Sequence, residues 1–340
     1  MHRDGTVEIV RHASVLLKDN PLGDSAERDL AIYLPPSYES SSDRRRFPVI
    51  YLLAGFTGSG LQLINRGAWT LPLHQRMNQL IADGRAAEAI LVLPDCFTRY
   101  GGSQYVDSPA IGRYQSYLTE ELVPFVDERY RTLADREHRA VAGKSSGGYG
   151  ALNLAFTRPD LFSRVASHAG DSAFDLSYLK EFGRTLLTLE KRGGVKGFLS
   201  WFDALPGKSG SGIEVMSNLC CAAAWSPSAS GPYGYGEGFE LPFDLYHGAL
   251  KLDVWARWLE RDPVRMLDNP KFLEAARSLQ TIYLDAGVAD EYNLQLGTRQ
   301  VAHKLKQANI AVTHEEFDGG HMNTPYRYDR SIAVLTESWK

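Results

Sequence analysis

The sequence predicts an α/β fold, in which a mostly parallel central sheet carries helices on both faces and one large insertion interrupts the core. Short apolar runs alternate with amphipathic runs along most of the 340 residues, as strands and helices do in such folds. The runs at residues 48–53 and 89–93 are continuously apolar, as expected of parallel strands buried on both sides. This alternation is absent from residues 171–277 and resumes after them. The length and the 44% hydrophobic content suit one large core with an insertion.

The predicted elements begin with an antiparallel strand pair at the edge of the sheet. Residues 7–18 and 30–34 form this pair, because turn-forming residues separate them and two prolines end the second run. The central strands are predicted at residues 48–53, 89–93, 138–142, 162–168, 280–284 and 310–317, and the helices at 73–83, 114–130, 147–156, 293–307 and 326–339. Their alternation with short links indicates a mostly parallel sheet with helices on both faces.

Residues 171–277 form the predicted insertion. This stretch has no clear sheet strand, and it holds glycine-rich breaks and a run of Pro, Gly, Ser and Tyr at residues 226–238. It also contains four of the six tryptophans. Long loops inside a compact chain usually serve function. We therefore expect residues 1–170 and 278–340 to form the core and the insertion to form a cap over the functional site, with an inert surface excursion as the alternative.

The composition limits which binding partners and which cellular compartment are expected. The net charge of −4 and the isoelectric point near 6.2 do not favour nucleic acid or an anionic membrane as a partner. No stretch approaches the roughly 18 apolar residues of a membrane span, and the N-terminus has no apolar leader. Cys96, Cys220 and Cys221 show no metal-binding spacing and are expected to be free thiols. We expect a small-molecule substrate, no metal or other cofactor, and a cytoplasmic location. A processed secreted protein would look the same, and a homodimer is left open.

Gly143-Lys144-Ser145-Ser146-Gly147 fits the G-x-S-x-G pattern of a nucleophile elbow. A strand is predicted before this motif, and a helix whose first turns consist of small residues is predicted after it. In that setting the serine adopts a strained backbone conformation that lifts its hydroxyl clear of the sheet, and the tight turn needs small neighbours. Ser145 is therefore the predicted nucleophile. The alternative is a glycine-rich turn with an incidental serine.

An activated serine needs a base within hydrogen-bond reach and a carboxylate that orients the base. On this type of fold the acid follows the serine in the chain, and the histidine follows the acid. His321 lies behind two glycines in the loop after the last strand and is the predicted base. Asp290, in the loop after the preceding strand, is the predicted acid. Asp285 and Asp171 are the alternatives, and Asp285 is expected instead to hold its loop by accepting backbone N–H bonds.

Acyl chemistry also requires two N–H groups aimed at the oxygen that becomes negative, which together form an oxyanion hole. One is predicted to be the backbone N–H of Ser146, which also begins a helix whose dipole favours negative charge. The other is predicted to be the N–H of Phe56, in the glycine-rich loop after the strand at residues 48–53. Trp69 and Tyr149 are candidates for lining a substrate pocket, and each is equally compatible with a place in the core.

These segments together resemble the putative-esterase family of the α/β-hydrolase superfamily. That family includes esterase D (S-formylglutathione hydrolase), the antigen 85 mycolyltransferases, enterochelin esterases and several feruloyl esterases. The resemblance rests on residues 33–38, 54–58, 93–95, 143–152, 287–290 and 319–321, and it spans roughly residues 28–170 and 278–335. The sequence departs from the family at Ala54, where many members have His or Ser. The insertion is also longer than esterase D needs. The resemblance therefore gives weaker support for S-formylglutathione, the substrate of esterase D, as the substrate of this chain.

The resemblance implies an α/β-hydrolase fold and a serine carboxylesterase that forms an acyl-enzyme through Ser145, His321 and Asp290. Two alternatives stay open: an acyltransferase with the same three residues, as in the antigen 85 branch, and a binding protein that keeps the fold without catalysis. The sequence does not define the acyl group or the alcohol.

Overall fold

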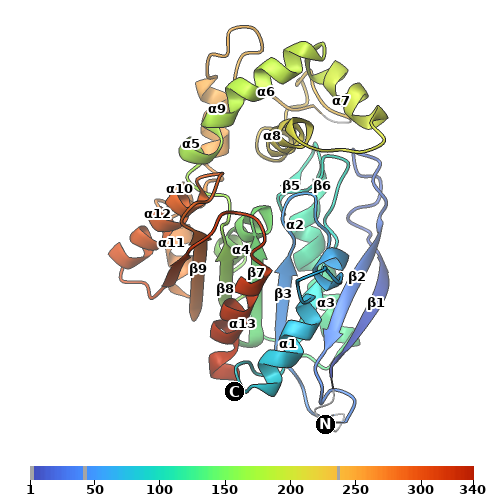
Figure 1. The fold of residues 1–340 in the computed structure, drawn as a ribbon, viewed down its shortest axis with the longest axis vertical. Helices are drawn as coiled ribbons and strands as arrows, with labels where there is room; N and C mark the ends of the chain where they lie inside the picture. The colour runs from blue at the N-terminus through green and yellow to red at the C-terminus, as the bar shows by residue number, and fades with distance from the viewer. Residues whose placement is uncertain (1–3, 41–43, 236–237) are drawn as a thin grey trace.

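An eight-stranded sheet forms the centre of the molecule (Figure 1). The structure is a computed structural model that describes residues 4–40, 44–235 and 238–340. The strand order is β1-β2-β4-β3-β7-β8-β9-β10. β1 (Thr6–Ala13) is antiparallel to β2 (Glu27–Leu34), which is antiparallel to β4 (Ile90–Leu93), and the remaining pairs are parallel. The predicted sheet, mostly parallel with an antiparallel edge, is confirmed.

The parallel strands lead into the loops that contain the predicted site residues. They are β3 (Val49–Leu53), β7 (Arg139–Lys144), β8 (Arg164–His168), β9 (Thr281–Gly287) and β10 (Thr313–Phe317). β3 and β4 are buried along their whole length, which explains their unbroken apolar sequences, and β8 is equally buried although it contains Arg164, Ser167 and His168. A separate small pair, β5 (Asp107–Ser108) and β6 (Gly112–Arg113), was not evident from the sequence.

Helices cover both faces of the sheet, as predicted. On one face, α1 (Leu73–Ala82) and α13 (Tyr328–Thr336) share a buried apolar cluster with alternate residues of the central strands. On the other face, α4 (Ser146–Thr157) and α12 (Leu294–Gln307) pack on the strands through the other set of alternate residues. Short 3₁₀ helices complete the described elements: η1 (Gly60–Ile64), η3 (Arg136–His138), η4 (Pro325–Arg327) and η5 (Glu337–Trp339).

One predicted helix has the expected extent but a different hydrogen-bond pattern. It consists of α2 (Tyr114–Ser116), a π-helical segment η2 (Tyr117–Leu122) and α3 (Val123–Arg129). The N–H of Val123 donates to the carbonyl of Leu118, five residues earlier. The next residue, Pro124, has no N–H to donate, so the wider turn directly precedes the position where the α-helical ladder is interrupted.

The described part of residues 171–277 contains helices and contributes no strand to the main sheet. These helices are α5 (Phe174–Ser177), α6 (Leu179–Lys191), α7 (Gly194–Ala204), α8 (Ser211–Trp225), α9 (Leu252–Leu259), α10 (Pro263–Met266) and α11 (Pro270–Arg277). Figure 1 shows α6, α7, α8 and α9 gathered at one end of the molecule, whereas α10 and α11 pack on α12 and α4 of the core. The insertion is fastened to the core by aromatic contacts, such as that of Trp225 with Tyr149 of α4 at 5.3 Å between ring centres.

Candidate active site

Ser145 lies at a sharp turn between β7 and α4. Its backbone has φ 57° and ψ −125°, outside the regions that non-glycine residues favour. Its N–H donates to the carbonyl of His168 on β8 at 2.9 Å, which helps to hold this strained turn. Both glycines of the motif are required because a side chain at either position would clash with backbone atoms. A Cβ at Gly143 would lie 2.2 Å from the carbonyl oxygen of Gly147, and a Cβ at Gly147 would lie 2.1 Å from that of Leu53.

The structure brings Ser145, His321 and Asp290 together as one hydrogen-bonded chain. Nε2 of His321 lies 3.0 Å from Oγ of Ser145, and Nδ1 lies 2.8 Å from Oδ2 of Asp290. Oδ1 of Asp290 accepts the N–H of Tyr292 at 2.9 Å, which fixes the carboxylate. His321 and Asp290 are 5% and 3% exposed, whereas Ser145 is half-buried, so solvent reaches the chain at the hydroxyl end. The three residues follow the carboxyl ends of parallel strands, where sites in open α/β sheets form.

The loop after β3 borders the elbow. A Cβ added to Gly55 would lie 3.4 Å from Cβ of Ser145, so the backbone of this loop runs beside the nucleophile. Among the described residues, the N–H of Phe56 has no hydrogen-bond partner. Ser146 is the first residue of α4, where backbone N–H groups have no partner within the helix. Both N–H groups predicted for the oxyanion hole therefore belong to segments that border Ser145, and neither has a hydrogen-bond partner among the described residues.

Asp171, one alternative acid, makes no hydrogen bond with His321 in the described part of the chain. Its Oδ2 accepts the hydroxyl of Tyr178 at 2.9 Å and lies 3.4 Å from Oγ of Ser146. Burial raises the pKa of Asp171, although the Tyr178 hydroxyl opposes that shift. This carboxyl therefore contacts the residue after the nucleophile rather than the histidine.

Asp285, the other alternative acid, belongs to a second Ser–His–Asp chain that lies wholly inside the core. Oδ1 of Asp285 lies 2.7 Å from Nδ1 of His168, whose Nε2 lies 2.8 Å from Oγ of Ser331 on α13. β8 and β9 pair in a register that places His168 opposite Asp285. The expectation that Asp285 holds its loop through backbone N–H groups is wrong. Its carboxylate accepts from side chains instead, including Arg327 at 2.8 Å and Tyr283 at 2.8 Å.

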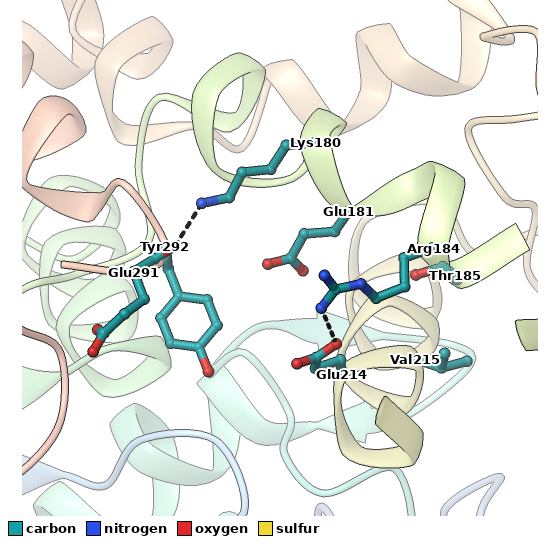
Figure 2. Close-up of a pocket in the computed structure, with 8 residues that line it drawn as sticks. All are labelled: Lys180, Glu181, Arg184, Thr185, Glu214, Val215, Glu291 and Tyr292. Atoms are coloured by element: carbon teal, nitrogen blue, oxygen red, sulfur yellow. Dashed lines mark hydrogen bonds and ion pairs between the residues drawn. The ribbon is translucent and has the colours of Figure 1, made fainter. Parts of the chain in front are cut away.

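A cavity of about 320 Å³ is lined in part by Tyr292, whose ring packs against His321; neither His321 nor Ser145 lines it. Its walls are Lys180, Glu181, Arg184 and Thr185 of α6, Glu214 and Val215 of α8, and Glu291 and Tyr292 after the acid. Figure 2 shows residues of α6 facing Glu291 and Tyr292, with Lys180 reaching the backbone of Glu291. Glu291 and Tyr292 were missed as site residues, and the available signal was their position directly after Asp290.

The two predicted pocket residues do not line this cavity. Trp69 is 97% exposed, so it encloses nothing in this structure. Tyr149 is fully buried and packs against Trp225 and Phe174, so its ring belongs to the junction between core and insertion. Within the described ranges, no group of side chains is arranged to bind a metal ion, and every helix is too short or too polar to span a bilayer.

The strand order and the elbow define the class of protein: it has the α/β-hydrolase fold. Solved structures agree. A ferulic acid esterase superimposes with a TM-score of 0.63 at 20% identity, covering 98% of this chain and 99% of the other. An S-formylglutathione hydrolase from Agrobacterium tumefaciens superimposes with a TM-score of 0.57 at 16% identity, covering 98% and 94%. At these identities the likeness shows the fold.

The family follows from the sequence match. A family model described as "Putative esterase" matches residues 25–329, and the chain belongs to this family. It is 30% identical over 142 residues to an endo-1,4-beta-xylanase/feruloyl esterase of Xylanibacter ruminicola, covering 38% of this chain and 18% of that protein. It is 29% identical over 157 residues to an esterase of Mycobacterium tuberculosis, covering 45% and 30%. The chain thus spans less than a third of the length of each of these two relatives.

Proposed function

We propose that this esterase works through a covalent acyl-enzyme on Ser145. The observation that supports the proposal is the hydrogen-bonded chain from Ser145 through His321 to Asp290 at a strained, half-buried elbow. Oγ of Ser145 attacks the ester carbonyl carbon while Nε2 of His321 takes its proton. Asp290 holds the imidazole through Nδ1 and stabilises its protonated form.

The reaction proceeds in two stages, acylation and deacylation, and each passes through a tetrahedral intermediate. The N–H groups of Phe56 and Ser146 donate to the negative oxygen, and the dipole of α4 adds to their effect. His321 returns the proton to the leaving alcohol as the C–O bond breaks. In deacylation, water gives a proton to the same imidazole and attacks the acyl carbon, and the imidazolium returns that proton to Oγ of Ser145 as the acyl–oxygen bond breaks, which releases the acid and free Ser145.

We assign residues 171–277 as a cap that borders the substrate site. The assignment is supported by the cavity between α6, α8 and residues Glu291 and Tyr292, because Tyr292 also packs edge-on against His321 with 4.9 Å between ring centres. The leaving alcohol must approach His321 to receive its proton, and one wall of this cavity, Tyr292, contacts that imidazole, which makes the cavity a candidate space for part of the substrate. Esters of ferulic acid are the first substrates to test, since a relative and several similar structures carry that activity in their names.

The test is active-site labelling together with an ester panel. The wild-type protein should be labelled by a fluorophosphonate and should hydrolyse p-nitrophenyl acetate and methyl ferulate. Ser145→Ala should lose labelling and at least about 10⁴-fold in kcat. Ser331→Ala, which removes the serine of the buried chain, is the matched control and should stay labelled and active. Full activity in Ser145→Ala, or labelling that depends on Ser331, would overturn the proposal.

A further inference from the structure

Three consecutive residues contact His321 at three different points. Asp290 accepts from Nδ1, as described above. Oε2 of Glu291 accepts the backbone N–H of His321 at 2.8 Å. The ring of Tyr292 packs edge-on against the imidazole, with an interplanar angle of 77°. Only the first of these contacts has a place in the mechanism proposed above.

The loop that carries His321 docks closely on the loop that carries Glu291. The N–H of Ala289 donates to the carbonyl of Gly319 at 3.0 Å. A Cβ at Gly320 would lie 2.6 Å from Oε1 of Glu291, so a larger residue there would displace this carboxylate. Gly320 thus allows the carboxylate to approach the N–H of the next residue, which is His321.

A residue of the insertion in turn holds the backbone of Glu291. Nζ of Lys180, on α6, donates to the backbone carbonyl of Glu291 at 2.7 Å (Figure 2). The hydrogen bond from the His321 N–H lowers the pKa of Glu291, so the side chain is ionised at neutral pH. A hydrogen bond to an ionised acceptor is about twice as strong as one between neutral groups. The backbone of His321 is therefore tied through Glu291 to a helix outside the core.

We propose that Glu291 is a positioning residue that holds the backbone of His321, and with it the imidazole, at hydrogen-bond distance from Ser145. The inference rests on the proposed function, since it assigns His321 as the base. Without Glu291 the loop behind Gly319 and Gly320 loses its side-chain anchor, and the imidazole moves relative to Ser145. Misplacement of a reacting group by about 1 Å costs on the order of 100-fold in rate.

The experiment compares Glu291→Ala with Glu291→Gln. Glu291→Ala removes the acceptor, so kcat on p-nitrophenyl acetate should fall roughly 10- to 100-fold while KM stays within about twofold. Glu291→Gln keeps an acceptor oxygen without the charge and should recover kcat to within about fivefold of wild type. The rate of fluorophosphonate labelling should follow kcat in both variants, and the thermal unfolding midpoint should stay at the wild-type value.

Asp318→Ala is the control, because Asp318 is exposed in the same loop and makes no hydrogen bond or ion pair within the described residues. It should keep wild-type kcat. The inference is overturned if Glu291→Ala keeps wild-type kcat, if Glu291→Gln loses as much as Glu291→Ala, or if the loss reflects unfolded protein. Ser145→Ala in the same assay separates the two claims. If Ser145→Ala is active, the proposed function fails; if Ser145→Ala is inactive and Glu291→Ala is fully active, only the inference fails.

Discussion

The molecule contains two hydrogen-bonded Ser–His–Asp chains that have similar hydrogen-bond distances but differ in burial, backbone strain and nearby charge. In one, Ser145 to His321 and His321 to Asp290 measure 3.0 and 2.8 Å; in the other, Ser331 to His168 and His168 to Asp285 measure 2.8 and 2.7 Å. The first ends at a half-buried serine in a strained turn. The second ends at a fully buried serine inside α13. Hydrogen-bond distances alone therefore do not identify a catalytic chain.

The charge around the two acids differs as well. Asp285 faces Arg327, which also pairs with Glu315, whereas Asp290 has no arginine or lysine ion pair among the described residues. Burial raises the pKa of Asp285, but His168, Arg327 and Tyr283 outweigh burial and hold that pKa below its ordinary value. The charge of Asp285 is thus compensated by a fixed cation. In the proposed mechanism, the charge of Asp290 stabilises the proton that His321 takes from Ser145.

The largest effect should come from exchanging each acid for its amide. Asp290→Asn should lower kcat by about 10⁴-fold with little change in unfolding free energy, because the amide presents the wrong partner to Nδ1 of His321. Asp285→Asn should leave kcat of the folded protein within about threefold but lower the unfolding free energy by about 3 kcal/mol, because it removes the buried carboxylate that holds His168 and leaves Arg327 only its ion pair with Glu315. Initial rates and urea unfolding of both variants measure the contrast. Equal losses of activity would mean that the second chain also takes part in catalysis.

A second, smaller contrast concerns pH and stability. Hydrogen bonds from Arg330 and Arg327 lower the pKa of Glu315 to about 2, and the pKa of Asp285 is also depressed. Carboxylates with depressed pKa values stabilise the folded state above their ordinary pKa values, and this stabilisation is lost as the pH falls through the folded-state values. The difference in urea midpoint between wild type and Arg327→Met should therefore be largest at neutral pH and narrow between about pH 4.5 and pH 2. A difference that stays constant over this range would show that the arginine acts through packing rather than charge.

The sequence predicted that Ser145, His321 and Asp290 come together, but not the surroundings of these residues, for a physical reason. Ser145 and His321 lie in glycine-bearing loops whose shape is local, and the order of acid and base along the chain restricts the choice. The partner of Asp285 depends on which strands pair and in what register, and nothing local marks His168 as its neighbour across the sheet.

Burial of aromatic residues was equally hard to predict. Trp69 and Tyr149 looked alike as candidates, yet one is 97% exposed and the other fully buried. Tyr149 is buried because residues 171–277 pack on α4, and this packing has no sequence motif. The hydrogen bond from the backbone N–H of His321 to Glu291 could not be predicted from the sequence either, because it depends on how two loops pack together.

The smallest expected effect tests whether the insertion acts on the catalytic chain. Lys180 is exposed and lines the cavity, and its one hydrogen bond among the described residues goes to the carbonyl of Glu291. Lys180→Met keeps the apolar stem and removes the donor, so kcat should fall about threefold, in line with a single exposed hydrogen bond of roughly 0.5 to 1 kcal/mol. The unfolding midpoint should not change. Arg327→Met should show the reverse pattern, because the buried chain is fastened by the core alone. If Lys180→Met and Arg327→Met both leave kcat unchanged, the insertion borders the site without positioning it, and the two chains differ only in access and backbone strain.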